Sequence, residues 1–200
     1  MENWILQIMQ TYGYVGTFLL ILIENLFPPI PSELILAFGG FLTTTTDLTI
    51  AGMIISSSLG AIVGAIMLYG LGLMLSVEKL KNTIVKFGPY IRLKYTDVER
   101  AMTWFDTKGM ITVFFCRMIP VLRSLISIPA GMAKMKLIPF LLYTTLGTVI
   151  WNTILVYFGA MLGANWKTIV HIFDAYSTFA YIAMALGAVT FIIWWFKYRK

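Results

Sequence analysis

The chain has 200 residues, of which 59% are apolar and only 12% carry a charge. Soluble domains contain about 45–50% apolar and about 25% charged residues, so this composition excludes a water-soluble enzyme and indicates a membrane protein. The net charge of +6 resides in one central connection and the last four residues, which favours contact with anionic lipid over binding of nucleic acid. The single Cys116 excludes an intramolecular disulfide and a multi-cysteine metal site, and we expect no cofactor.

Residues 14–43 are apolar, but two acids and three prolines interrupt them. These are Glu24, Pro28, Pro29, Pro31 and Glu33. A proline inside a helix removes a backbone hydrogen bond and clashes with the preceding turn, so we predict two helices of about 10–13 residues. Neither is long enough to cross a hydrocarbon core about 30 Å thick, which predicts a re-entrant hairpin. Broken backbone at this depth is tolerated only inside protein or beside a wet cavity, so the hairpin points to a site.

Three longer stretches contain no charged side chain and predict full transmembrane spans. They are residues 48–77, 137–166 and 175–196, and each is long enough to cross the bilayer as a helix. Between the first two spans, residues 78–108 alternate charged and apolar positions, which predicts amphipathic helices along the membrane interface.

A second interrupted stretch, residues 110–133, carries two bases and two prolines. These are Arg117, Pro120, Pro129 and Arg123. The same reasoning predicts a second re-entrant hairpin here. The fold class is therefore an all-α polytopic membrane protein with two proline-broken re-entrant hairpins, three full spans and interfacial helices.

Basic residues near the span ends predict the orientation. The connection 76–109 holds seven basic and four acidic residues, and the chain ends Lys-Tyr-Arg-Lys, so both should be cytoplasmic. The two hairpins then open from opposite leaflets. Residues 1–77 and 78–166 become an inverted repeat, followed by the final span, within one membrane domain of residues 1–200. Secondary transporters often have this plan, with the ligand near the midplane.

The four charges within the hairpins are the candidate site residues. An Asp, Lys or Arg at the bilayer centre costs about 2.5–3.5 kcal/mol on insertion scales, so buried ionisable groups need compensation. Glu24 and Glu33 on one hairpin can neutralise Arg117 and Arg123 on the other if the tips meet, and Glu33 with Arg123 is the pair to test. The structural alternative is that these ion pairs only join two halves of the protein.

A phosphate head group is the ligand that these residue types favour. A break at Pro120 lets Arg117 and Arg123 converge, although six residues would separate them to opposite sides of a continuous helix. The planar guanidinium group binds two phosphate oxygens at once, and a lipid tail can stay in the bilayer. Burial favours the neutral form of a carboxyl group, so Glu24 and Glu33 are candidates to carry protons or to exchange arginine partners.

Two segments resemble the signature of the DedA (SNARE-associated, or VTT-domain) family of integral membrane proteins. Residues 115–123 read FCRMIPVLR and residues 130–135 read AGMAKM, similar in order and spacing to F-x-R-x-x-P-x-x-R and AG-x-x-x-M. Residues 24–33, ENLFPPIPSE, resemble the family's first hairpin. The resemblance implies translocation of undecaprenyl phosphate or of phospholipids such as phosphatidylethanolamine between leaflets, in some members driven by the proton motive force. It also implies that the two glutamates and two arginines are the functional residues.

We therefore predict a flippase, not an enzyme, in the bacterial cytoplasmic membrane. It would return undecaprenyl phosphate from the outer to the inner leaflet for recycling of the cell-wall lipid carrier, with protons as candidate coupling ions and a homo-oligomer left open. One alternative moves phosphatidylethanolamine, as a flippase or scramblase, and another is a proton-coupled ion antiporter. Two more are a membrane organiser and a membrane-embedded lipid phosphatase, which would need a nucleophile with a base, or a metal.

Overall fold

The computed structural model describes residues 2–27, 32–75, 95–119 and 122–165, and all its regular structure there is helical. The elements are α1 (Glu2–Leu26), α2 (Ser32–Thr45), α3 (Ile50–Met74), α5 (Tyr95–Cys116), α6 (Leu122–Leu125), α7 (Ser127–Met132), α8 (Leu137–Leu162) and the 3-10 turn η1 (Gly163–Asn165). The predicted all-α class is confirmed for these residues. The predicted final span, residues 175–196, and the larger part of the predicted interfacial segment lie outside the described residues.

Three helices are long and apolar enough to cross a membrane: Ile50–Met74, Leu137–Leu162 and Trp4–Leu26. The first two correspond to predicted spans. The third was not predicted as a span, because residues 14–43 were expected to form a hairpin broken near its middle. The helix in fact begins well before residue 14, and the prolines lie beyond its end.

Gly13 interrupts the helical geometry of α1 and divides it into two arms. Its φ of 51° and ψ of −118° depart from helical geometry, and glycine adopts such a positive φ without the steric penalty of a Cβ atom. The second arm, residues 14–26, is therefore a separate short helix in direction. In the segment predicted to form the second hairpin, α5 continues without a break across the boundary that the sequence suggested near residues 108–110.

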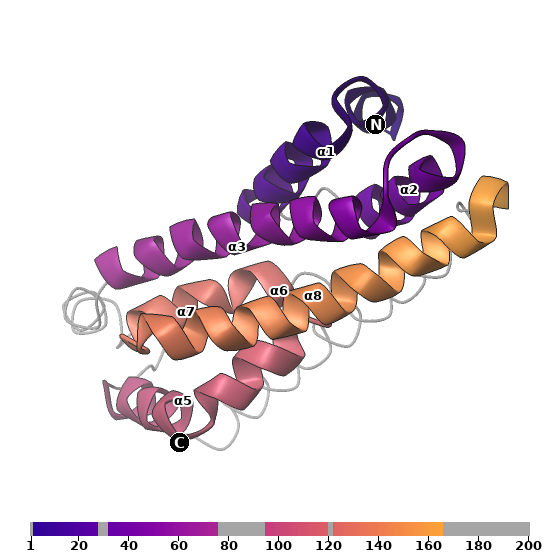
Figure 1. The fold of residues 1–200 in the computed structure, drawn as a ribbon. Coiled ribbons are helices and arrows are strands. Elements are labelled where there is room, and N and C mark those ends of the chain that lie inside the picture. Colours follow the sequence, from indigo (N-terminus) through magenta and orange to yellow (C-terminus); the bar gives the residue numbers. More distant parts are fainter. Residues whose placement is uncertain (1, 28–31, 76–94, 120–121, 166–200) are drawn as a thin grey trace, which may run out of the picture.

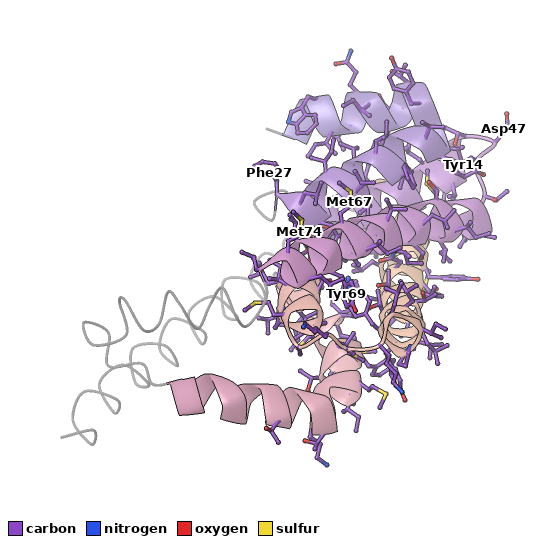
Figure 2. All side chains as sticks on the ribbon, turned by 90° about the vertical axis from the view of Figure 1, so that its left-hand side faces the viewer. Tyr14, Phe27, Asp47, Met67, Tyr69 and Met74 are labelled. Carbon is purple, nitrogen blue, oxygen red and sulfur yellow. The ribbon has the colours of Figure 1, made fainter. Side chains whose placement is uncertain are left out.

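The helices α3 and α8 run side by side along the molecule, and the other helices pack against them (Figure 1). The apolar core is formed in two parts. One lies mainly among α1, α2, α3 and α8, and the other among α3, α5, α7 and α8. Large apolar side chains also cover the outside of the molecule. Phe27 and Met74, for example, are about two-thirds exposed. They lie on one side of the view in Figure 2, and Asp47 lies on the opposite side. This pattern is expected of helices that face lipid tails.

Close backbone contacts at glycine join α2 to α8. A Cβ atom added at Gly40 of α2 would lie 2.1 Å from the carbonyl oxygen of Val156. One added at Gly159 of α8 would lie 2.1 Å from the carbonyl oxygen of Ala37. Neither position can carry a side chain unless the facing backbone moves, so the two glycines allow the helices to approach this closely.

The same contact occurs between α7 and α3. A Cβ atom added at Gly131 of α7 would lie 2.1 Å from the carbonyl oxygen of Tyr69, and one added at Gly72 of α3 would lie 2.2 Å from that of Ile128. In each of these two contacts, both helices supply a glycine and, three residues earlier, the backbone carbonyl that meets the other glycine. The C-terminal part of α3 thus packs against α7 in the same way as the C-terminal part of α8 packs against α2.

Candidate functional site

The four predicted ionisable residues lie together in the interior. Their exposed fractions are 4% for Glu24, 6% for Glu33, 1% for Arg117 and 2% for Arg123. Glu24 lies near the end of α1 and Glu33 near the start of α2, whereas Arg117 follows the last residue of α5 and Arg123 belongs to α6. The charges of Glu33 and both arginines act on Glu24 across this space. All four predicted positions therefore contribute to one buried cluster.

The breaks in the helices explain how these side chains reach one place. Four of the predicted helix-breaking prolines lie outside the described residues: Pro28, Pro29, Pro31 and Pro120. Pro129 can be placed: α6 ends at Leu125 and α7 begins at Ser127. Because a proline at position 129 cannot donate to the carbonyl group four residues earlier, that of Leu125, it accounts for the break between the two short helices.

Arg123 connects the two halves of the chain. Its Nη2 atom lies 3.7 Å from Oε2 of Glu24, as a buried ion pair, and its Nη1 atom donates a hydrogen bond of 3.2 Å to Oγ of Ser32. Ser32 begins α2, so one guanidinium group contacts both α1 and α2 of the first half. The sequence had suggested Glu33 for this pairing. Instead, Oε1 of Glu33 is buried without a hydrogen-bond partner among the described atoms.

Arg117 is surrounded by hydroxyl groups. Its Nη2 atom donates to Oγ of Ser127 at 2.8 Å and to Oγ1 of Thr144 at 3.4 Å. Its Nε and Nη1 atoms are buried and have no partner in the described part of the chain, and no carboxylate there forms an ion pair with it. Gly147 allows the approach, because a Cβ atom there would lie 2.9 Å from Cβ of Arg117.

Several buried hydroxyl and amide groups near the four charges were missed in the sequence reasoning. Ser32, Ser127 and Thr144 bind the arginines directly. Farther along α8, Nδ2 of Asn152 donates to Oγ of both Ser57 (3.1 Å) and Ser58 (3.2 Å) on α3. A signal was present, since residues 144, 148 and 152 are all polar at a spacing of four in a largely apolar span.

The arrangement suits an anion with two or more oxygen acceptors. Arg117 offers two unused nitrogen atoms, and a guanidinium group that lacks an anion in a buried site gains strong, charge-assisted hydrogen bonds when one arrives. No group of three or more His, Cys, Asp or Glu side chains that could hold a metal ion occurs among the described residues. The cluster thus offers the unused guanidinium nitrogen atoms of Arg117 to an anion, with two carboxyl groups in the same buried space.

Comparison with known proteins gives both a family and named relatives. The VTT domain matches residues 30–161. A protein of Lactococcus lactis subsp. cremoris (strain MG1363) named "Alkaline phosphatase-like protein" is 52% identical over 96% of this chain and 89% of its own length. "Undecaprenyl phosphate transporter A" of Staphylococcus aureus is 36% identical over 100% and 98% of the two chains. "Protein DedA" of Escherichia coli is 26% identical over 78% and 73%. No solved structure matches the chain.

Proposed function

This chain belongs to the VTT-domain (DedA) family of membrane proteins, and on that premise we propose that it is a lipid flippase for undecaprenyl phosphate. Relatives in Staphylococcus aureus and Bacillus subtilis carry the name of an undecaprenyl phosphate transporter. The observation that supports this most directly is the buried guanidinium group of Arg117, with two nitrogen atoms that lack an acceptor in the described structure. A phosphate monoester supplies oxygen acceptors in the geometry that arginine prefers.

In the proposed transport step, Arg117 receives the phosphate and Arg123 changes partner. Arg123 forms an ion pair with Glu24. As the phosphate approaches, it competes with the Glu24 carboxylate for Arg123, and a proton taken up by Glu24 or Glu33 removes the repulsion between carboxylate and phosphate. Protons are therefore the proposed coupling ions, and transport runs from the outer to the inner leaflet of the bacterial cytoplasmic membrane.

We propose that the two halves form an inverted repeat of re-entrant hairpins around this site. The glycine contacts support this idea, since α2 meets α8 as α7 meets α3. The contacts of α1 with α3 and of α5 with α8 support it as well. A Cβ atom added at Gly60 of α3 would meet the carbonyl oxygen of Phe18 in α1, and one added at Gly147 of α8 would meet that of Phe114 in α5. The basic residues at the C-terminus favour a cytoplasmic position for it.

Reconstitution into proteoliposomes tests the proposal. A fluorescent undecaprenyl phosphate analogue is followed by quenching from one side for the wild type, Arg117→Ala and Arg123→Ala, with labelled phosphatidylethanolamine in parallel. We expect the polyprenyl phosphate to move in the wild type and not in the two arginine variants. Lys108→Ala is the matched control, because it removes an exposed cation of α5 outside the buried cluster and should leave transport unchanged. Movement of phosphatidylethanolamine alone would overturn the substrate, and no lipid movement would overturn the flippase.

A lipid phosphatase is the second candidate, favoured by the name of the Lactococcus relatives. Ser127 would be the candidate nucleophile, since its hydroxyl group lies 2.8 Å from Arg117. A serine nucleophile needs a base to take its proton, and an arginine stays protonated and cannot serve. Measurement of inorganic phosphate released from undecaprenyl phosphate separates the two: a flippase moves the lipid and releases none.

A further inference from the structure

One face of α8 carries a line of buried polar side chains through the middle of a membrane helix. Thr144, Thr148 and Asn152 are spaced by four residues, so they lie above one another on one face. None of the three is more than 2% exposed. At 1.5 Å per residue the line is about 12 Å long. We name it, together with Ser57 and Ser58 of α3, the polar ladder.

The ladder begins at the anion site. Oγ1 of Thr144 accepts a hydrogen bond from Nη2 of Arg117, the arginine that has no carboxylate partner among the described residues. The positive charge of Arg117 therefore lies directly at one end of the ladder. Such a charge attracts anions and repels cations, so an ion or head group that uses this route is negatively charged.

The ladder ends at the contact between α2 and α8. Asn152 reaches across to Ser57 and Ser58 of α3. The next position on the same face of α8 is Val156, and its carbonyl oxygen is the atom that leaves no room for a side chain at Gly40 of α2. The polar groups thus stop where two helices close on each other.

Two atoms of the ladder are unused. Oγ1 of Thr148 and Oδ1 of Asn152 are buried and have no hydrogen-bond partner in the described structure. If the Asn152 amide is turned over, its nitrogen is left open in place of its oxygen, so one open group remains in either orientation. Side chains that serve only to join helices would be expected to satisfy their polar atoms, because each buried unpaired group is destabilising.

We propose that the polar ladder is the path along which the phosphate head group travels between Arg117 and the α2–α8 contact. This inference rests on the proposed function. Hydroxyl and amide groups donate hydrogen bonds to phosphate oxygens, yet they carry no charge that would retain the anion. A path of this kind holds the head group strongly enough to enter and weakly enough to leave, whereas Arg117 provides the strong binding position.

Thr148→Val tests the path. Valine has nearly the shape of threonine, and the hydroxyl group that it removes has no protein partner in the described structure, so the variant should melt at the same temperature as the wild type or higher. Transport of a fluorescent polyprenyl monophosphate in proteoliposomes should slow about tenfold, as expected when a hydrogen bond to a charged group is lost. The affinity of the polyprenyl monophosphate for the detergent-solubilised variant should differ less than twofold from its affinity for the wild type. Thr153→Val, on another face of α8 and half-buried, is the matched control and should transport normally.

The outcomes separate this inference from the proposed function. If Thr148→Val transports at the wild-type rate while Arg117→Ala does not transport, the ladder is wrong and the flippase stands. If Arg117→Ala transports normally, the proposed function fails, and the ladder with it. Uptake of radioactive inorganic phosphate into the same vesicles is the last arm. We expect none, and uptake that falls in Thr148→Val would assign the ladder to free phosphate and overturn the lipid path.

Discussion

The two buried arginines have opposite surroundings, although they are six residues apart. Arg123 faces a carboxylate, Glu24, and a hydroxyl group from the other half of the chain. Arg117 donates hydrogen bonds to hydroxyl groups of its own half, from Ser127 and Thr144, and forms no ion pair among the described residues. A buried charge with a counter-charge is a structural link, and one without it is prepared for an anion from elsewhere. Under the proposed function, this difference is a division of work: Arg123 joins the halves and Arg117 receives the ligand.

The largest expected effect would break this comparison at the level of stability. Arg123→Met leaves Glu24 buried without its ion-pair partner, and breaking a buried ion pair from one side costs about 3–5 kcal/mol. Arg117→Met removes a cation with no carboxylate partner in the described structure, so its free energy of unfolding should stay equal to the wild-type value or rise. Unfolding by SDS in mixed micelles measures both. Equal losses in the two variants would show that the arginines do the same work.

A double-mutant cycle sharpens the comparison on the acidic side. Glu24→Gln and Glu33→Gln are each combined with Arg123→Met, and the coupling energies are taken from the same unfolding measurement. Groups in one ion pair couple by about 0.5–3 kcal/mol. We expect a value in this range for Glu24 and a smaller one for Glu33, whose carboxylate forms no ion pair with an arginine among the described residues. A larger coupling for Glu33 would restore the pairing suggested by the sequence.

The smallest expected effect concerns the hydroxyl groups around Arg117. Ser127→Ala removes the 2.8 Å hydrogen bond and Thr144→Val the 3.4 Å one, and the shorter bond should matter more. Ser127→Ala should weaken lipid binding about tenfold, because a hydrogen bond to a charged group is worth about 1.5–3 kcal/mol. Thr144→Val should weaken it less. Titration of the lipid against tryptophan fluorescence in detergent gives both constants, and the reverse order would mean that Thr144 is the main anchor.

The sequence predicted the members of the charged cluster better than their pairing. Four ionisable residues in apolar stretches are conspicuous, because each one is unfavourable in lipid. Which glutamate meets Arg123 depends on how α1, α2 and α6 pack together, and no local pattern encodes that. Ser127 and Thr144 were missed for another reason: hydroxyl groups are common in membrane helices, where they serve packing.

The course of the helices was predicted in part. Absence of charge over more than 20 residues identified α3 and α8, since spanning length is a direct physical requirement. The change of direction at Gly13 could not be foreseen, because glycine in a membrane helix more often allows close packing than a positive φ. The glycine contacts between α2 and α8 likewise depend on a partner far away in the chain.

The ion pair between Glu24 and Arg123 has a consequence for biosynthesis. The ribosome makes Glu24 99 residues before Arg123, so at about 5–20 residues per second the acid waits about 5–20 s for its counter-charge. During that interval, the first half either keeps Glu24 near water or holds it protonated, since a lone carboxylate in hydrocarbon is strongly unfavourable. In the first of these cases, the nascent first half reaches its final depth only after α6 has entered the membrane.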